Sequence, residues 1–392
     1  MTAVLCRHFG LQHIEVAEDI ASETFLKASE HWAIHGVPAN PQGWLYTVAK
    51  NKAKDYFKRQ AVFESRVKPA IQPAASEAEI AFEFSSQVIA DSQLAMIFAV
   101  ASPVNAAESQ ICLALQVLCG FSVEEIANAF LAKKETIKKR LLRARENLRN
   151  DNFQLNALNE AEISARLDTV LRTIYLLFNE GYFSKTDDEV IRRELCSEAV
   201  RLAVVLTEHA LTNVAKVSAL LALLCFQSSR LAARTNSNKE TILFEEQDRS
   251  LWDQLLIDKG NHFLVNACAG NEVSKYHLEA AIAYWHTTPT VDKKWEHILS
   301  LYDQLIIIEY SPVTMLNRIF ALAKVRGNAA GIAAAEELNM EDNCAYHELL
   351  GYLYTSLAAH KAIAHYNKAI ELTKSNAEKK TLQKAIERLM FK

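Results

Sequence analysis

Basic side chains are concentrated in two short stretches of this chain, and a nucleic-acid backbone is the partner that such stretches suit. The stretch from Lys133 to Arg149 contains eight Lys or Arg residues and two acids. The stretch from Lys50 to Lys68 contains seven Lys or Arg residues and two acids. The whole chain carries a formal net charge of −4, so the signal is the clustering and not the total charge. This pattern favours contacts with polyphosphate.

The basic stretch Lys133–Arg149 belongs to a segment, residues 121–149, that has the pattern of a helix-turn-helix. Ser122 and Glu125 form a capping-box pair that predicts a helix from Val123 to Phe130. After a break near 131–134, a second helix is predicted from Glu135. It has an apolar face made of Ile137, Leu141, Ala144 and Leu148. A solvated basic helix is the plain alternative, but the tight spacing favours a major-groove reader. The candidate DNA-contacting residues are Thr136, Lys138, Lys139, Arg140, Arg143 and Arg145.

The basic stretch that starts at Lys50 ends a predicted helical unit at residues 1–60. An acidic amphipathic helix at 17–28 precedes a break at Asn40 and Pro41, because proline disfavours helix at the residue before it. A helix from Gly43 follows and ends basic. Its interleaved rings and cations suit single-stranded DNA, whose bases stack on rings. Burial in a core is the favoured alternative for Trp44 and Phe57. The candidates for this contact are Asn40, Trp44, Lys50, Asn51, Lys54, Lys58 and Arg59.

Composition indicates that helices position all of these residues. The chain has only 10 Gly and 7 Pro, and 50% of it is hydrophobic, without period-two alternation. We therefore expect an all-α protein. Its predicted parts are a helical domain at 1–60, a linker at 61–90, a helix-turn-helix domain at 91–150 and a helical extension at 151–392.

The sequence also excludes several classes of protein. It has no apolar run of membrane-spanning length and no visible signal peptide, so we expect no membrane association. Its seven cysteines are scattered without a CxxC pair, which is typical of buried thiols in a reducing cytoplasm. We expect no metal and no cofactor.

Two segments together resemble sigma-70-type factors of bacterial RNA polymerase. Residues 119–127 and 135–145 resemble region 4, which binds the −35 promoter element and the polymerase β flap. Residues 17–59 resemble region 2, whose acidic helix docks on the β′ clamp helices and whose next loop and helix bind the −10 element. The resemblance implies polymerase contacts for Glu18, Asp19, Glu23 and Phe25. The family's turn glycine is Leu131 here, which predicts a turn of different shape.

The length of the two segments points to a class within that family. Residues 1–150 leave no room for the large region 1 or a full region 3, which indicates the extracytoplasmic-function type. Members usually have about another helical turn or more before the position of Met1, so either Met1 is a short start or the first helix of region 2 is curtailed, and part of the polymerase contact depends on which.

The extension resembles that of a sigma subgroup with tetratricopeptide-like repeats. The resemblance rests on residues 171–182, 245–253 and 311–318. Independently, Leu350, Gly351, Tyr354, Ala362, Tyr366 and Ala369 follow the helix-pair repeat pattern, and stacked repeats form a concave binding surface.

Polar residues in the extension raise the question of an enzyme. They are Asn179, Glu180, Asp248, Arg249, His277 and His286. No nucleophile elbow, phosphate loop or HExxH motif accompanies them, so contacts that hold helices together are favoured over catalysis.

The leading hypothesis is a sigma factor, not an enzyme, that binds core RNA polymerase and promoter DNA. Its extension would regulate it through a protein or small-molecule signal. The alternative is a stand-alone helix-turn-helix regulator with a ligand- or partner-sensing repeat domain. A third is a solenoid scaffold or enzyme with an incidental basic helix. Residues 15–59 favour the first, because a plain regulator does not need them.

Overall fold

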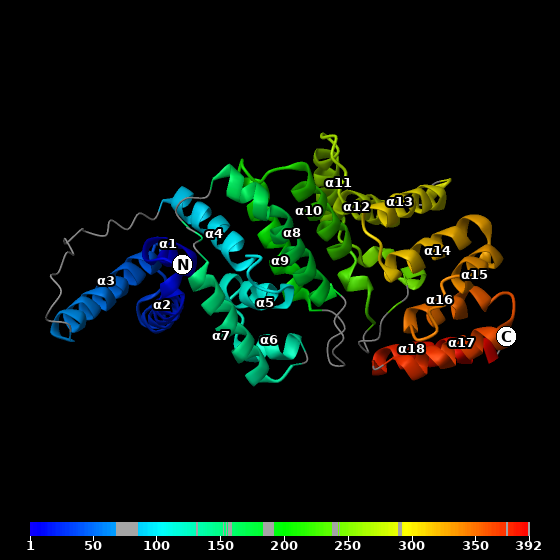
Figure 1. Ribbon diagram of the computed structural model, residues 1–392, viewed down its shortest axis with the longest axis horizontal. Coiled ribbons are helices and arrows are strands. Elements are labelled where there is room, and N and C mark those ends of the chain that lie inside the picture. The colour runs from blue at the N-terminus through cyan, green and yellow to red at the C-terminus, as the bar shows by residue number, and fades with distance from the viewer. Residues whose placement is uncertain are drawn as a thin grey trace. The chain divides into compact units, whose positions relative to one another are not determined.

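The computed structural model describes residues 1–67, 85–130, 132–151, 153, 155, 159–182, 192–236, 242, 244–288, 292–373 and 375–390 (Figure 1). These residues form helices and connecting turns without a β-sheet, which confirms the predicted all-α class. They divide into two compact units, Met1–Thr173 and Ile174–Lys392. Among the described helices, none is long and apolar enough to cross a membrane.

The first unit contains seven helices and the start of an eighth among its described residues. They are α1 (Thr2–Phe9), α2 (Ile14–His35), α3 (Pro41–Val67), α4 (Ser86–Val100), α5 (Ala107–Leu113), α6 (Val123–Ala129), α7 (Lys134–Asn150) and α8 (Glu160–Tyr182). Helices α3 and α4 extend into both ends of the predicted linker, and residues 68–84 lie outside the described part. The predicted domain boundaries stay predictions.

Helix α4 lies at the centre of this unit. Its residues from Leu94 to Val100 are all buried, so it is enclosed on every side in that stretch. The side chain of Ser85 caps its first turn by accepting the N–H of Val88 at 3.3 Å. Helix α1 packs on α4 and on α2, and it buries Val4, Leu5 and Cys6. An all-round apolar helix needs such a central place.

The capping box and the apolar stripe predicted for α6 and α7 are confirmed. Glu125 N–H donates to the Ser122 hydroxyl at 3.2 Å, and Ser122 N–H donates to the Glu125 carboxylate at 2.7 Å. The buried residues of α7 are Ile137, Leu141, Ala144 and Leu148. Helix α7 begins at Lys134, one residue before the predicted start. Leu131, on which the predicted turn shape depends, lies outside the described residues.

The second unit is a succession of helices that pack on their sequence neighbours. They are α9 (Arg193–Glu208), α10 (Ala215–Ser228), α11 (Gln254–Ala267), α12 (Lys275–Thr287), α13 (Lys294–Ile308), α14 (Pro312–Arg326), α15 (Asn328–Glu336), α16 (Cys344–Tyr354), α17 (Ala359–Leu372) and α18 (Asn376–Met390). Helix α10 is buried from Val217 to Phe226 and contacts α9, α11 and α12. It forms the core of the first part of this unit.

The predicted repeat positions lie in the core of the last helices. Leu350, Tyr354, Ala362, Tyr366 and Ala369 belong to one buried cluster of α16, α17 and their neighbours. At Gly351 an added Cβ would lie 2.6 Å from the Tyr366 ring, so the glycine permits the close approach of α16 and α17.

A Gly260→Ala substitution in α11 should destabilise the protein, although alanine favours helix over glycine. The new Cβ would lie 2.6 Å from the ring of Phe226, which is fully buried and cannot move aside freely. We expect a loss of roughly 1–3 kcal/mol in unfolding free energy, measured by urea titration. The matched control is Gly270→Ala, whose Cβ would meet Ala215 at an ordinary 3.6 Å. Equal stability of the two variants would contradict the packing described here.

Candidate functional site

The solvent face of α7 carries most of the predicted DNA-contacting side chains. Thr136, Lys138, Lys139 and Arg143 are exposed, on the sides of the helix away from its buried stripe. Lys138 pairs with Glu135 at 2.9 Å, but both side chains are solvated, so this pair restrains the lysine weakly. These four residues are available to a partner.

The other two predicted residues of α7 are bound to acids of the same unit. Arg140 pairs with Glu108 of α5 at 2.6 Å. Arg145 pairs with Glu18 of α2 at 2.5 Å and donates to Gln116 at 2.9 Å, and both members of the ion pair are mostly buried. In this conformation Arg140 and Arg145 therefore face protein groups.

A second ion pair joins α2 and α7 one turn further on. Arg149 pairs with Glu15, and together with Arg145–Glu18 it forms what we call the α2–α7 clasp. Burial raises the pKa of Glu18, while the attraction of Arg145 lowers it by less. Desolvation thus outweighs the attraction at Glu18, so the clasp stabilises the fold only weakly. Releasing Arg145 to another anion would leave the buried Glu18 carboxyl without its partner, which costs free energy unless Glu18 takes up a proton.

Helix α2 exposes the remaining residues predicted to bind polymerase. Asp19, Glu23 and Phe25 are exposed, whereas Glu18 is held in the clasp. The exposed fraction of Phe25 is 55% and that of Leu26 is 61%, so the two adjacent side chains offer an apolar contact beside Asp19 and Glu23. Glu23 also pairs with Lys52 of α3 at 2.5 Å.

Helix α3 presents most of its basic residues and Tyr56 to solvent, whereas Trp44, Tyr46 and Phe57 are turned more towards the protein. Asn51, Lys54, Lys58 and Arg59 are exposed, and Lys50 is partly exposed. Asn40 caps the helix by accepting the Gly43 N–H at 2.8 Å. Trp44 is half-buried 5.6 Å from the Trp32 ring, and Phe57 packs 4.5 Å from Phe9, which agrees with the core alternative for both rings.

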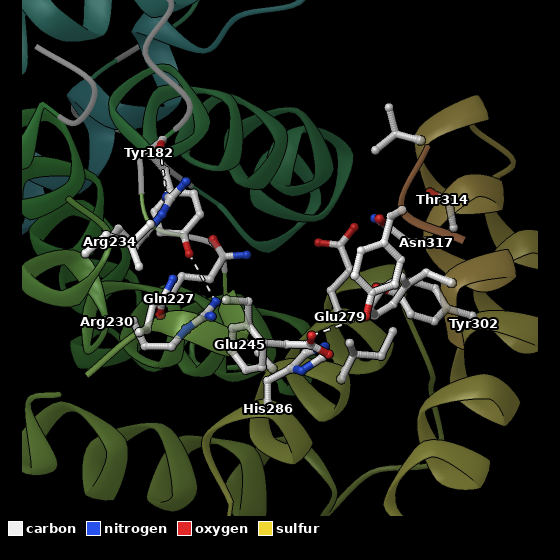
Figure 2. Close-up of a pocket in the computed structure, with 18 of the residues that line it drawn as sticks. Tyr182, Gln227, Arg230, Arg234, Glu245, Glu279, His286, Tyr302, Thr314 and Asn317 are labelled. Carbon is white, nitrogen blue, oxygen red and sulfur yellow. Dashed lines mark hydrogen bonds between the residues drawn. The ribbon is translucent and has the colours of Figure 1, made fainter. Parts of the chain in front are cut away.

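The second unit contains a cavity of about 1000 Å³ (Figure 2). Its lining includes Asn179 and His286, which the sequence singled out, and Gln227, Arg230, Arg234, Glu279 and Tyr302, which it did not. The sequence contained one signal for the two arginines: residues 209–239 hold four Lys or Arg residues and no acid. The cavity draws its lining from α8, α10, α12, α13, α14 and the last helices.

Two arginines meet a tyrosine at one end of this cavity. Arg230 donates to the Tyr182 hydroxyl at 3.1 Å, and Arg234 donates to the Tyr182 carbonyl at 2.8 Å. The Arg234 guanidinium also lies 3.7 Å from the centre of the Tyr182 ring. Burial lowers the pKa of Arg234. Figure 2 shows these groups on one side of the cavity, with Glu279, Tyr302 and Asn317 on the other.

A buried acid occupies the opposite side. Glu279 accepts the Tyr175 hydroxyl at 3.3 Å, and burial raises the pKa of Glu279 to about 7 against the attraction of Lys275. The carboxyl is therefore about half protonated at neutral pH.

The other polar residues noted in the sequence make structural contacts. Asp248 caps a short turn by accepting the Ser250 N–H at 2.9 Å. His277 accepts the Ser274 N–H at 3.1 Å and completes the capping box of α12. The ring of Trp252 lies 5.4 Å from the Arg249 guanidinium. His277 also contacts the Ala267 carbonyl of α11 at 3.3 Å and so joins two helices as the sequence analysis favoured, whereas the contacts of Asp248 and Arg249 are local and exposed and join none.

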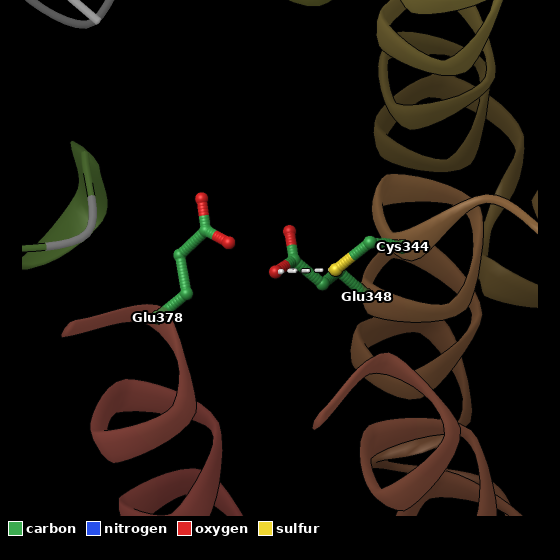
Figure 3. A group of neighbouring side chains, drawn as sticks. All are labelled: Cys344, Glu348 and Glu378. Carbon is green, nitrogen blue, oxygen red and sulfur yellow. Dashed lines mark hydrogen bonds between the residues drawn. The ribbon is translucent and has the colours of Figure 1, made fainter. Parts of the chain in front are cut away.

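One group of side chains in the described part could hold a metal ion (Figure 3). The ligand atoms of Cys344, Glu348 and Glu378 lie within 4.8 Å of one another. The thiol donates to Glu348 at 3.7 Å and to the Ala369 carbonyl at 3.5 Å. Burial raises the pKa of Cys344 to about 12 and that of Glu348 to about 7, so a metal would have to displace protons from both.

Comparison with known proteins gives two family models and one relative. The model described as Sigma-70 region 2 matches residues 3–62, and a family of unknown function (DUF6596) matches residues 166–268. The uncharacterized protein R00370 of Rhizobium meliloti (strain 1021) is 31% identical over 382 residues, which cover 95% of this chain and 89% of that protein. No solved structure matches.

Opening the α2–α7 clasp should strengthen DNA binding by the free protein. In a Glu15→Gln/Glu18→Gln variant, Arg145 and Arg149 lose their carboxylate partners and become available to phosphates. We expect several-fold tighter binding to duplex DNA and a salt dependence steeper by about one to two ion equivalents. Fluorescence anisotropy across salt concentrations measures both. The control is Glu30→Gln/Glu146→Gln, which removes two exposed acids from the same two helices and so changes the net charge equally. An equal gain in the control would mean that net charge alone is responsible.

Glu279 should contribute a loss of stability to the second unit as pH rises from about 4.5 to 7, because the folded state holds a proton that the unfolded state releases in this window. This contribution is complete below the window and lost above it, whereas the lowered pKa of His286 acts in the opposite direction as pH rises towards 6.5. Glu279→Gln should remove this dependence and gain roughly 1–3 kcal/mol over wild type at pH 8, with little gain at pH 4.5. Urea unfolding at both pH values measures it, with exposed Glu272→Gln as control. A difference in unfolding free energy between the variant and wild type that did not change with pH would contradict the raised pKa of Glu279.

Proposed function

Residues 3–62 of this chain match sigma-70 region 2, and on this premise we propose that it is a sigma-70 family factor of the extracytoplasmic-function type, which binds core RNA polymerase and directs promoter-specific transcription initiation. One observation carries the proposal: the residues that match Sigma-70 region 2 form α1, α2 and most of α3. This match favours a sigma factor over a stand-alone regulator, which has no need of region 2.

The proposed polymerase contact is the exposed face of α2. Asp19 and Glu23 supply negative charge and Phe25 supplies an exposed ring, a combination that suits a surface with basic and apolar groups such as the β′ clamp helices. The module of α6 and α7 is assigned to the β flap. Glu18 is a weaker candidate for direct contact, because it is committed to Arg145.

The proposed promoter contacts lie on α3 and α7. Lys54, Lys58 and Arg59 are exposed along α3 and would follow the phosphates near the −10 element, with Lys50 and Asn51 beside them. Trp44 and Asn40, at the start of α3, would border the captured base.

On α7, the distance of each side chain from the buried stripe separates two kinds of contact. Thr136, Lys139 and Arg143 lie farthest from the stripe and would read base edges of the −35 element, while Lys138 would contact phosphate. Arg140 and Arg145 would also contact the DNA once their ion pairs with Glu108 and Glu18 open.

The second unit is proposed to regulate initiation from within the same chain. Its buried repeat positions on α16 and α17 support a tetratricopeptide-like arrangement, which commonly offers a binding surface. The proposed place of action is the cytoplasm, where polymerase and promoter are found.

Removal of the exposed α2 contacts should weaken polymerase binding and initiation without unfolding the protein. For an Asp19→Arg/Phe25→Ala variant we expect core-polymerase affinity to fall at least about tenfold, since an exposed ring and a charge each contribute about 1 kcal/mol or more at an interface. The measurement is co-purification with core polymerase, followed by in vitro transcription from the DNA upstream of the gene.

The control for this experiment is Glu272→Arg, an equal charge change at an exposed position of the second unit. Wild-type affinity in the α2 variant, with circular dichroism unchanged, would remove the assignment of region 2. Failure of the wild-type protein to bind core polymerase would overturn the proposed function itself.

A further inference from the structure

Glu279 differs from the other acids that line the cavity of the second unit. Of the four acids in the described lining, three are held in ion pairs, namely Glu245 with Lys324, Glu246 with Arg388 and Glu309 with Lys275. Glu279 forms no ion pair with the described residues and instead accepts the uncharged Tyr175 hydroxyl at 3.3 Å. Its side chain is only partly buried, so a molecule in the cavity can reach it. A carboxyl in such a place is stabilised either by a proton or by a cation that a ligand supplies.

The charged groups around Glu279 leave room for one more cation. Lys275, one turn earlier in α12, attracts Glu279, but its ammonium lies 2.8 Å from the Glu309 carboxylate. Two carboxyl groups therefore face one ammonium group at this end of the cavity. Figure 2 shows Glu279 on the side of the cavity opposite Arg230 and Arg234. An added cation beside Glu279 would balance the charge of its immediate surroundings.

Two phenol groups border the same carboxyl. Tyr175 of α8 donates to it, and Tyr302 of α13 lies close enough for the charge of Glu279 to raise its pKa. Burial is the larger cause of the raised pKa of both tyrosines, so both stay uncharged at neutral pH. Phenol oxygens accept hydrogen bonds and phenol rings attract cations to their faces. The Tyr175 ring already does so, because the Lys275 ammonium lies 5.1 Å from its centre.

Aromatic rings lie further along the same face of α12. Glu279, Ala283 and His286 all line the cavity, and the seven residues from the first to the last span about 10 Å of helix. The His286 ring lies 4.9 Å from the Phe244 ring and 5.8 Å from the Trp295 ring, centre to centre. Burial is the main cause that lowers the pKa of His286 to about 3, so this ring carries no charge at neutral pH. A molecule with a cationic head and an apolar ring would find a suitable surface for each part.

We propose that this cavity binds a small organic cation, a primary amine that carries an apolar ring, with its ammonium group on Glu279 and its ring near Phe244 and Trp295. The ammonium would donate to the Glu279 carboxylate and to the hydroxyl oxygens of Tyr175 and Tyr302, which gives an acceptor for each of its three hydrogens. A cavity of about 1000 Å³ accommodates a molecule of this kind. The inference concerns binding alone and does not depend on the proposed role in transcription.

Tryptamine and tryptophol separate the two parts of the proposed ligand when each is titrated into the full-length protein by calorimetry. They share an indole ring and a two-carbon chain, which ends in an ammonium group in tryptamine and in an uncharged hydroxyl in tryptophol. We expect wild type at pH 8 to bind tryptamine at least about tenfold more tightly, as a charge-assisted hydrogen bond provides. Glu279→Gln should bring the two affinities within about twofold of each other. Glu279→Asp, which keeps the charge, should retain part of the preference.

The pH dependence gives a second readout that a purely structural role of Glu279 would not produce. Between pH 6 and 8 the affinity of wild type for tryptamine should rise about tenfold, because the ionised fraction of a carboxyl with a pKa of about 7 rises by that factor. Tryptamine stays protonated in this range, since an alkyl amine has a pKa of about 10. Tryptophol binding should not change with pH, and Glu279→Gln should lack the rise. This variant removes a desolvated acid and should stay folded, which circular dichroism checks.

The control is Glu272→Gln, which removes an exposed acid outside the cavity lining and should leave both affinities unchanged. An equal loss of tryptamine affinity in this control would assign the preference to net charge and not to the cavity. The inference would also be overturned if wild type bound neither compound, if it bound the two equally, or if folded Glu279→Gln kept the preference for tryptamine.

Discussion

The burial of one apolar stripe on α7 is the constraint from which the arrangement of the first unit follows. Ile137, Leu141, Ala144 and Leu148 can be buried together only in one rotation of the helix, because residues step by about 100°. That rotation leaves Lys139 and Arg143 in water and turns Arg145 towards α2. A single packing requirement therefore divides the cations of one helix into those that are free and those that are already bound.

The same division marks how far the sequence could predict the first unit. The capping box at Ser122 and the stripe of α7 were predictable because they depend on neighbours within a few residues. The Arg145–Glu18 pair was not, because its partners are 127 positions apart and their meeting depends on how α2 and the turn Leu11–His13 before it pack on α7. Local periodicity gives the face of a helix, but it does not identify what covers that face.

The cavity of the second unit was harder still to predict. Its lining extends from Tyr175 to Leu389 and includes residues whose individual neighbours in the sequence are unremarkable. Asn179 and His286 were noticed only because they are polar residues in an apolar stretch. Arg230 and Arg234 could have been noticed because no acid occurs from 209 to 239. That observation indicates a site only once the fold is known to enclose them. Desolvation then changes their chemistry, as it does for His286 and Glu279, and composition cannot report desolvation.

Helix α8 gives the two units a shared element. The boundary between them falls at Thr173, inside this helix. On one side of the boundary, Thr173 donates to the Gln110 side chain of the first unit at 3.2 Å. On the other, Tyr175 and Tyr182 line the cavity. One helix therefore contributes to the core of the first unit and to the cavity wall of the second, so a substitution at either end of α8 acts on an element that both units use.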